Sequence, residues 1–174
     1  MLEAVRATKN FNDEELAIAD ELIEVVLTQP DQKDYFAFVS EATSAASANN
    51  GNAVSGFLLV GPTPATVGTY DMYWIVVHPA YQGQGVAQSL DNYAVSFVKE
   101  RNGYWLIAET SSQPSYERPR AFYIKQGYSV LARIPDYYKP GDDLIIFGKR
   151  VARIGDDPAR VESIAATAEL SAFI

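Results

Sequence analysis

The chain has 174 residues, which is enough for one α/β domain with a substantial core and too few for two ordinary domains. Its formal net charge of -8 argues against nucleic acid or an anionic membrane as a partner, because either would need a clustered basic face. There is no cysteine, which excludes disulfides, thiolate metal sites and a cysteine nucleophile.

Residues 1–6 lack the basic segment and the long apolar run of a signal peptide. No later stretch approaches the roughly 20 apolar residues of a membrane span. A soluble cytoplasmic protein is therefore the simplest interpretation.

A helix is predicted to begin at residue 13. Asn12 and Glu15 form a capping box there, and Phe11 with Leu16 can supply a hydrophobic staple. Apolar residues then repeat at helical spacing until Pro30 prevents continuation. No strand is recognised ahead of this helix.

Three strands are predicted next. The first covers residues 34–41 and the second Val54–Gly61, with an Ala/Ser/Asn-rich loop at 44–52 that we expect to be mobile. The third, Thr69–His78, is almost continuously apolar and aromatic, as a strand buried on both faces should be, and it stops at Pro79. We interpret it as the central strand.

From Gly85 the pattern changes to a helical period, which Asn102-Gly103 closes. Tyr104–Thr110 is predicted to be the next strand, and Pro119–Gln126 a short helix that Gly127 ends. A strand, a glycine-containing loop and a helix thus follow one another directly.

The chain is predicted to close with a strand pair, Tyr128–Pro135 and Leu144–Val151. Asp157-Pro158 is a helix-start signal beyond it. Residues 152–174 are therefore expected to form a helical C-terminal extension that is stable only if it docks.

The segment Gln82–Ala87 is the strongest candidate for a binding loop. Backbone N–H groups that approach phosphate oxygens need small residues, and the helix that follows offers the positive end of its dipole. The alternative is a plain glycine turn between a strand and a helix. The spacing matches neither the GxGxxG fingerprint of dinucleotide folds nor a P-loop.

The sequence resembles the GNAT acetyltransferase superfamily in two blocks. The family's loop follows a strand that ends in Val-x-Pro, here Val77-His78-Pro79, and continues with the equivalents of Gln82, Gly85 and Ala87. The second block is Arg120–Tyr128, a short helix that carries a tyrosine and is followed by glycine and an aromatic residue. Two motifs in the correct order are stronger evidence than one.

The resemblance covers about residues 10–151 and implies a single GNAT domain over residues 1–151. The implied fold is α/β (α+β): a mixed, mostly antiparallel central sheet flanked by helices, with acetyl-CoA bound where the two central strands splay apart. No metal is required. For the cofactor, the resemblance implies contacts of Ile75, Val76 and Val77 with the pantetheine arm, and of Gly83, Gln84, Gly85, Val86, Ala87 and Gln88 with the pyrophosphate.

Tyr123 occupies the family position of the general acid, where a phenol can donate a proton or a hydrogen bond to a departing thiolate. The alternative is a tyrosine packed into the core, since most of the 11 tyrosines must be structural. The family match favours the catalytic interpretation.

Glu109 ends an otherwise apolar strand, where its carboxylate could deprotonate an amine directly or through water. A solvated charge at the strand end is an equal alternative, and Asp71 or a water chain could serve as the base instead. His78 is the only histidine and is interpreted as a strand-end residue rather than a base.

Two further features bear on the substrate side. A cluster of acids and tyrosines could attract a cationic amine, although solvated acids around a Pro140-Gly141 turn are the favoured interpretation; the cluster comprises Asp136, Tyr137, Tyr138, Asp142 and Asp143. Tyr116 stands where many relatives have an asparagine that touches the cofactor.

The resemblance therefore implies an N-acetyltransferase that moves an acetyl group from acetyl-CoA to an amine of a small molecule or peptide within a ternary complex. A non-catalytic acyl-CoA-binding or sensing module is the alternative, because fold does not dictate function. A homodimer formed through the tail and the acidic face is a further possibility.

Overall fold

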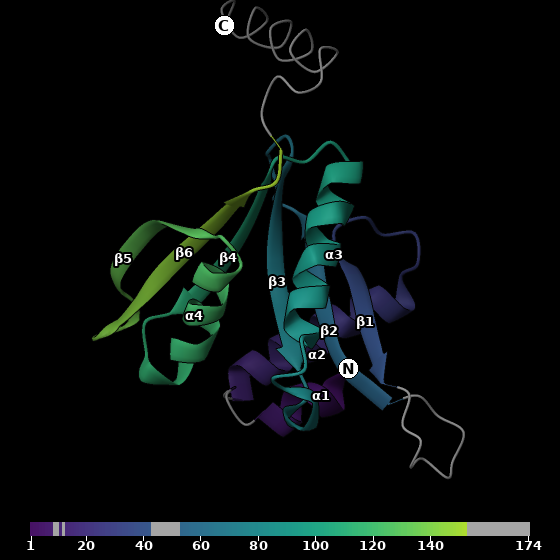
Figure 1. The fold of residues 1–174 in the computed structure, drawn as a ribbon, viewed down its shortest axis with the longest axis horizontal. Helices are drawn as coiled ribbons and strands as arrows, with labels where there is room; N and C mark the ends of the chain where they lie inside the picture. The colour runs from purple at the N-terminus through teal and green to yellow at the C-terminus, as the bar shows by residue number, and fades with distance from the viewer. Residues whose placement is uncertain (9–10, 12, 43–52, 153–174) are drawn as a thin grey trace, which may run out of the picture.

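A computed structural model describes residues 1–8, 11, 13–42 and 53–152. They form one six-stranded sheet in the order β1-β2-β3-β4-β6-β5, with helices on both faces (Figure 1). The strands are β1 (Phe36–Ala42), β2 (Ala53–Pro62), β3 (Thr69–Val77), β4 (Trp105–Ser111), β5 (Ser129–Lys139) and β6 (Asp142–Arg150). The α-helices are α1 (Leu2–Thr8), α2 (Asp13–Thr28), α3 (Val86–Glu100) and α4 (Glu117–Lys125), and the 3-10 turns are η1 (Pro79–Tyr81) and η2 (Pro114–Tyr116).

The sheet consists of two antiparallel halves joined by one parallel pair. Strands β1, β2 and β3 form one half, and β4, β6 and β5 form the other. Strands β3 and β4 run parallel, so the chain needs a crossover between them, which α3 provides. The mixed, mostly antiparallel sheet that the sequence predicted is confirmed.

The parallel pairing between β3 and β4 is short. It holds at only three levels of the sheet: Thr69 with Trp105, Tyr70 with Leu106 and Asp71 with Ile107. Beyond that point β3 continues to Val77 and β4 to Ser111 without pairing to each other. The two central strands therefore diverge, as Figure 1 shows between the teal and green halves of the sheet.

A β-bulge bends β3 at the level where this divergence begins. Val60 of β2 lies opposite Met72, whereas the next pair joins Leu59 to Trp74. Tyr73 is therefore the extra residue of the bulge, and such a residue increases local bend and twist.

Both faces of the sheet are buried by helices, which explains the apolar runs of β2 and β3. Helices α3 and α4 cover one face, over a core that includes Leu58, Val60, Met72, Leu106, Tyr123 and Phe147. Helices α1 and α2 cover the other, over a core formed by Ala4, Val5, Ala19, Ile23, Phe57, Leu59 and Val76. None of the described helices is long and apolar enough to span a bilayer.

A buried charge ties α3 to the second half of the sheet. Asp91 of α3 is 0% exposed; it accepts a hydrogen bond from the Tyr128 hydroxyl at 2.7 Å and one from Lys149 Nζ at 2.8 Å. Lys149 lies on β6, and Tyr128 follows α4 directly. A buried carboxylate is tolerated when it is paired and hydrogen-bonded in this way.

The N-terminal helix α1 was missed by the sequence analysis. It is only 7 residues long, and it is held by burial of Ala4 and Val5 rather than by a recognisable cap. Strand β5 also runs beyond the predicted Pro135, to Lys139. The predicted cap at Asn12, the loop at 44–52 and the tail from residue 153 lie outside the described residues.

Candidate active site

A cleft opens where β3 and β4 diverge. Its volume is about 1240 Å³, and it is lined by residues 73–77 of β3, residues 109–111 of β4, the loop that precedes α3, and parts of α2 and α4. The cleft therefore lies between the two halves of the sheet, and its position follows directly from the short parallel pairing. Most of the predicted site residues meet here.

The glycine loop forms one end of the cleft. Gly83 and Gly85 have φ values of 75° and 85°, in the left-handed region that favours glycine, and a Cβ at either position would meet no atom within 4 Å. The first bond of α3 runs from the Ser89 N–H to the Gly85 carbonyl at 3.0 Å. The N–H groups of the first helical turn before Ser89 are thus available to an anion.

The predicted loop residues divide into two groups. Gly83, Gly85, Val86, Ala87 and Gln88 line the cleft. Gln84 is outside the cleft lining, and its Nε2 donates to the Ala80 carbonyl at 3.0 Å, which braces the loop. The predicted pantetheine contacts on β3 also line the cleft: Ile75, Val76 and Val77.

His78 stabilises the entry to this loop. Its Nδ1 accepts a hydrogen bond from the Ala80 N–H at 3.2 Å, at the start of η1. His78 is not part of the cleft lining. Its position fits the strand-end role expected from the sequence better than a role as a base.

Tyr123 of α4 lines the cleft and also belongs to the core. It is 6% exposed, and its ring lies 5.3 Å from the ring of Tyr128 and 5.3 Å from that of Phe147. Burial raises the pKa of Tyr123, and the Asp91 carboxylate raises it further. The phenol therefore stays protonated at neutral pH and can act only as a donor to a developing anion.

Glu109 lines the cleft from β4. Burial raises the pKa of Glu109, and the charge of Asp71 raises it further. Asp71 is not part of the cleft lining, and burial raises its own pKa too. Asp71 thus acts on Glu109 through its charge, while Glu109 is the carboxylate that faces the cleft.

Tyr116 bridges the two walls of the cleft. Its hydroxyl lies 2.5 Å from Oε1 of Glu15, so η2 is joined to α2 across the open side. Burial, followed by the hydrogen bond to Glu15, raises the pKa of Tyr116. The Tyr116 hydroxyl is thus directed towards α2.

Three comparisons with known proteins bear on this arrangement. A family profile described as "Acetyltransferase (GNAT) domain" matches residues 35–130. A GNAT-family structure from Desulfovibrio desulfuricans is 36% identical and has a TM-score of 0.78, and the match covers 87% of this chain and 90% of that chain. No curated protein sequence matches the chain. The chain belongs to the GNAT acetyltransferase family.

Other GNAT acetyltransferase structures share the fold at lower identity. An aminoglycoside 6'-N-acetyltransferase complexed with coenzyme A is 17% identical, with 89% of this chain and 91% of that chain covered and a TM-score of 0.65. The protein yncA from Salmonella typhimurium, solved with its cofactor acetyl-CoA, is 21% identical, with 84% and 78% covered and a TM-score of 0.57. Those two proteins bind the cofactor; their similarity to this chain shows the fold.

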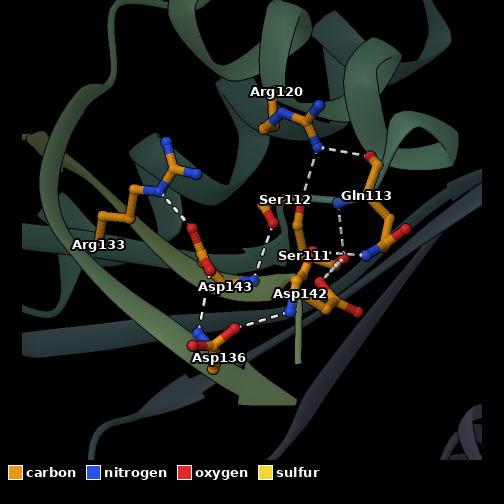
Figure 2. Close-up of polar contacts among 9 residues, drawn as sticks. Ser111, Ser112, Gln113, Arg120, Arg133, Asp136, Asp142 and Asp143 are labelled. Atoms are coloured by element: carbon orange, nitrogen blue, oxygen red, sulfur yellow. Dashed lines mark hydrogen bonds and ion pairs between the residues drawn. The ribbon is translucent and has the colours of Figure 1, made fainter. Parts of the chain in front are cut away.

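The β4 wall of this GNAT domain is braced by a polar network from the hairpin of β5 and β6 (Figure 2). Ser111 Oγ donates to Asp142 and accepts from the Gln113 N–H at 3.0 Å. Arg120 Nη1 donates to the carbonyls of Ser111 at 2.7 Å and Gln113 at 2.8 Å. The network holds the end of β4 at a fixed position relative to α4.

The expectation of solvated acids around the Pro140-Gly141 turn is wrong for two of them. Asp142 is buried, although it is part of the cleft lining. Asp143 accepts from the Asp136 N–H at 3.0 Å and pairs with Arg133 at 2.5 Å; these bonds, in that order, lower its pKa. Both acids therefore form hydrogen bonds that stabilise the hairpin of β5 and β6 and its contact with β4.

Sequence reasoning missed several cleft residues of this GNAT acetyltransferase. Glu14, Glu15 and Ile18 enter from α2, and Arg118 and Lys125 lie on the cleft-facing side of α4. The spacing of seven between Arg118 and Lys125 could have indicated a shared helix face. No group of His, Cys, Asp or Glu side chains suited to a metal occurs among the described residues.

Proposed function

We propose that this acetyltransferase is an N-acetyltransferase that transfers the acetyl group of acetyl-CoA directly to an amine of a small molecule or peptide. The observation that carries the proposal is that one cleft is lined by the glycine loop, by Tyr123 and by Glu109. Donor, acid and base positions are then all within reach of a single bound pair of substrates.

The residues present fit acetyl-CoA. The open space in front of Gly83 and Gly85 and the start of α3 suit a pyrophosphate, and Arg118 and Lys125 offer cations to its phosphates. The unpaired edge of β3 suits an extended arm that carries amide groups. Acetyl-CoA supplies an acetyl group as a thioester, which an amine can attack.

Tyr123 provides the hydrogen bond that the departing sulfur needs. In the transfer, the amine nitrogen bonds to the acetyl carbon and the carbon–sulfur bond breaks. A free thiol has a pKa of about 8.5, below that of any phenol with a raised pKa, so complete proton transfer from Tyr123 is uphill. Tyr123 therefore acts chiefly as a hydrogen-bond donor to the thiolate.

Glu109 takes the proton that the amine loses, directly or through one water. Burial, and then the charge of Asp71, raise the pKa of Glu109, which makes it a stronger base than an ordinary glutamate. Burial raises the pKa of Tyr138 to about 12, together with the charges of its neighbours, which are, in decreasing order of effect, Glu109, Tyr137, Asp142 and Glu15. The negative charge gathered here favours a cationic ammonium group as the incoming acceptor.

Two measurements on the same protein test the proposal against the alternative of a sensing module. Calorimetric titration with CoA measures binding, and a thiol-release screen with acetyl-CoA presents amino acids, polyamines, aminoglycosides and peptides. Binding accompanied by release with at least one amine is the expected result. Binding without release for any amine would favour a sensor, and absence of CoA binding would overturn both.

A further inference from the structure

The Thr110 hydroxyl makes no hydrogen bond to the described part of the protein. Thr110 is 6% exposed, and its Oγ1 is buried with no hydrogen-bond partner among the residues that the structure describes. Its backbone pairs with Ile145 of β6, so the strand does not need the side chain for its hydrogen bonds. A buried hydroxyl without a partner is unfavourable and calls for an explanation.

Thr110 lines the cleft on the side of the sheet that α4 covers. Side chains alternate along β4, and Ala108 and Leu106, two and four residues earlier, belong to the same core as Tyr123. Thr110 shares their face and lines the cleft, whereas Glu109 belongs to the opposite face. Thr110 and Tyr123 therefore lie on the donor side, and Glu109 lies on the acceptor side.

Thr110 is also at the level where the donor's reactive end should lie. Strands β3 and β4 are in register from Thr69 and Trp105 to Asp71 and Ile107. Counting three residues past the last pair, and allowing for the extra residue Tyr73 in β3, puts Thr110 about level with Ile75, the first of the β3 residues expected to contact pantetheine. Thr110 lines the gap that an extended arm would fill, and its Oγ1 is the buried polar atom of that wall.

We propose that the Thr110 hydroxyl forms a hydrogen bond with the acyl-pantetheine arm of the donor and thereby positions its thioester. This inference rests on the proposed function. A hydroxyl can donate to a carbonyl and accept from an amide N–H, and the arm carries both kinds of group. The hydroxyl would gain its partner only when the donor binds, which makes it a contact specific to the complex.

The test compares binding with stability in the same variants. Thr110→Val keeps the shape and removes the hydroxyl, and Thr110→Ala is a second variant in case valine packs poorly. We expect the Kd for acetyl-CoA, measured by calorimetry, to rise about two- to ten-fold in both variants. Because Thr110 Oγ1 has no partner in the free protein, the melting temperature of Thr110→Val should be unchanged or higher.

Two controls sharpen the outcome. Thr110→Ser retains a hydroxyl and should restore binding to within about two-fold of the original. Thr69→Val removes a hydroxyl from β3 outside the cleft and should leave the Kd unchanged. Parallel titrations with CoA show which group of the donor the hydroxyl contacts. Loss of a contact to an amide of the arm should raise the Kd for both CoA and acetyl-CoA, whereas loss of a contact to the thioester carbonyl should raise the Kd for acetyl-CoA alone. Either pattern supports the proposal.

Three results would overturn the inference. The first is an unchanged Kd in Thr110→Val and Thr110→Ala while the parent protein binds acetyl-CoA, which would leave the proposed function intact. The second is a rise in the acceptor KM with unchanged donor binding, which would move the hydroxyl to the other substrate. The third is an absence of CoA binding by the parent protein, which would overturn the proposed function as well.

Discussion

The Tyr116 hydroxyl and the Glu15 carboxylate, 101 positions apart in the chain, meet at 2.5 Å across the open side of the cleft. This hydrogen bond links the helix that precedes the sheet with the turn that precedes α4. It therefore ties together two parts of the cleft lining that come from α2 and η2.

Replacing Tyr116 by phenylalanine should loosen this wall without disturbing the donor site. We expect the acceptor KM to rise about three- to ten-fold, because a hydrogen bond to a charged group is worth about 1.5–3 kcal/mol and part of it is recovered from water. The Kd for acetyl-CoA should not change. Tyr93→Phe on the exposed side of α3 is the matched control, and an unchanged acceptor KM in Tyr116→Phe would contradict the assignment.

Tyr123→Phe tests the role of the phenol at the leaving group. We expect kcat to fall about 100-fold, as for the loss of one hydrogen-bond donor to a developing anion, with little change in donor affinity. Because the pKa of Tyr123 is raised, the parent enzyme should show no alkaline loss of kcat from this group below pH 10. Steady-state thiol release from pH 7 to 10 measures both effects. Full activity in Tyr123→Phe would exclude Tyr123 as the hydrogen-bond donor to the leaving thiolate.

Glu109→Gln should remove the acidic limb of the kcat/KM profile. The pKa of Glu109 is raised, so the limb should lie above the ordinary glutamate value of about 4.3, and activity should be lost as pH falls through it. Asp71→Asn should move the limb to lower pH, since the Asp71 charge contributes to the shift. A profile that is the same in all three proteins would exclude Glu109 as the base.

The same shift predicts a pH dependence of stability. A carboxyl with a raised folded-state pKa holds its proton more tightly when folded, so its favourable contribution is present below the unfolded pKa and is lost as pH rises through the folded pKa. The unfolding free energy of the parent protein should therefore fall, relative to that of Glu109→Gln, as pH increases from 4 to 7. Urea titrations at both pH values measure the difference.

Gly85→Ala tests the loop, and Gly127→Ala is its matched control. Both glycines have φ values of 85°, and at both a Cβ would meet nothing within 4 Å. Each substitution should therefore cost about 1 kcal/mol of stability through backbone strain alone. Only Gly85→Ala should also weaken CoA binding, by about ten-fold or more, because its methyl group would enter the phosphate space; equal affinities would argue against the loop assignment.

Asp91→Ala tests the buried ion pair between α3 and β6. Removing the carboxylate leaves Lys149, whose side chain is 19% exposed, without its partner, and we expect a loss of about 3–5 kcal/mol in unfolding free energy. Lys149→Met in the Asp91→Ala background should recover part of that loss. A loss below about 1 kcal/mol in Asp91→Ala would show that the pair is not important for stability.

The glycine loop and the order of the strands could be predicted from sequence because their signals are local. The change of period at Gly85 and the block from Arg120 to Tyr128 each fit within one element. The sequence could not place three other residues in the cleft, because their positions depend on which side of a diverging sheet each one faces: Glu15, Tyr116 and Thr110. No spacing along the chain encodes a contact between residues 101 positions apart.

Some alternatives raised by the sequence are resolved by burial and geometry. The interpretation of Tyr123 as a core tyrosine is confirmed, and the residue also lines the cleft; its catalytic role stays a prediction. Asp142 was expected to be solvated and is instead bonded to Ser111, because the hairpin folds back over the end of β4. Short helices such as α1 escape prediction when burial alone holds them.

The short pairing of β3 with β4 has a consequence for amide hydrogen exchange. Past Asp71, the edge of β3 that faces β4 has no strand partner, so alternate backbone amides there should lose their protons to solvent quickly even though the strand is central. An extended ligand arm laid along that edge would slow them, as an added strand would. The two middle strands would then behave as a continuous sheet only in the complex, in which the ligand arm occupies the place of the missing strand pairing between β3 and β4.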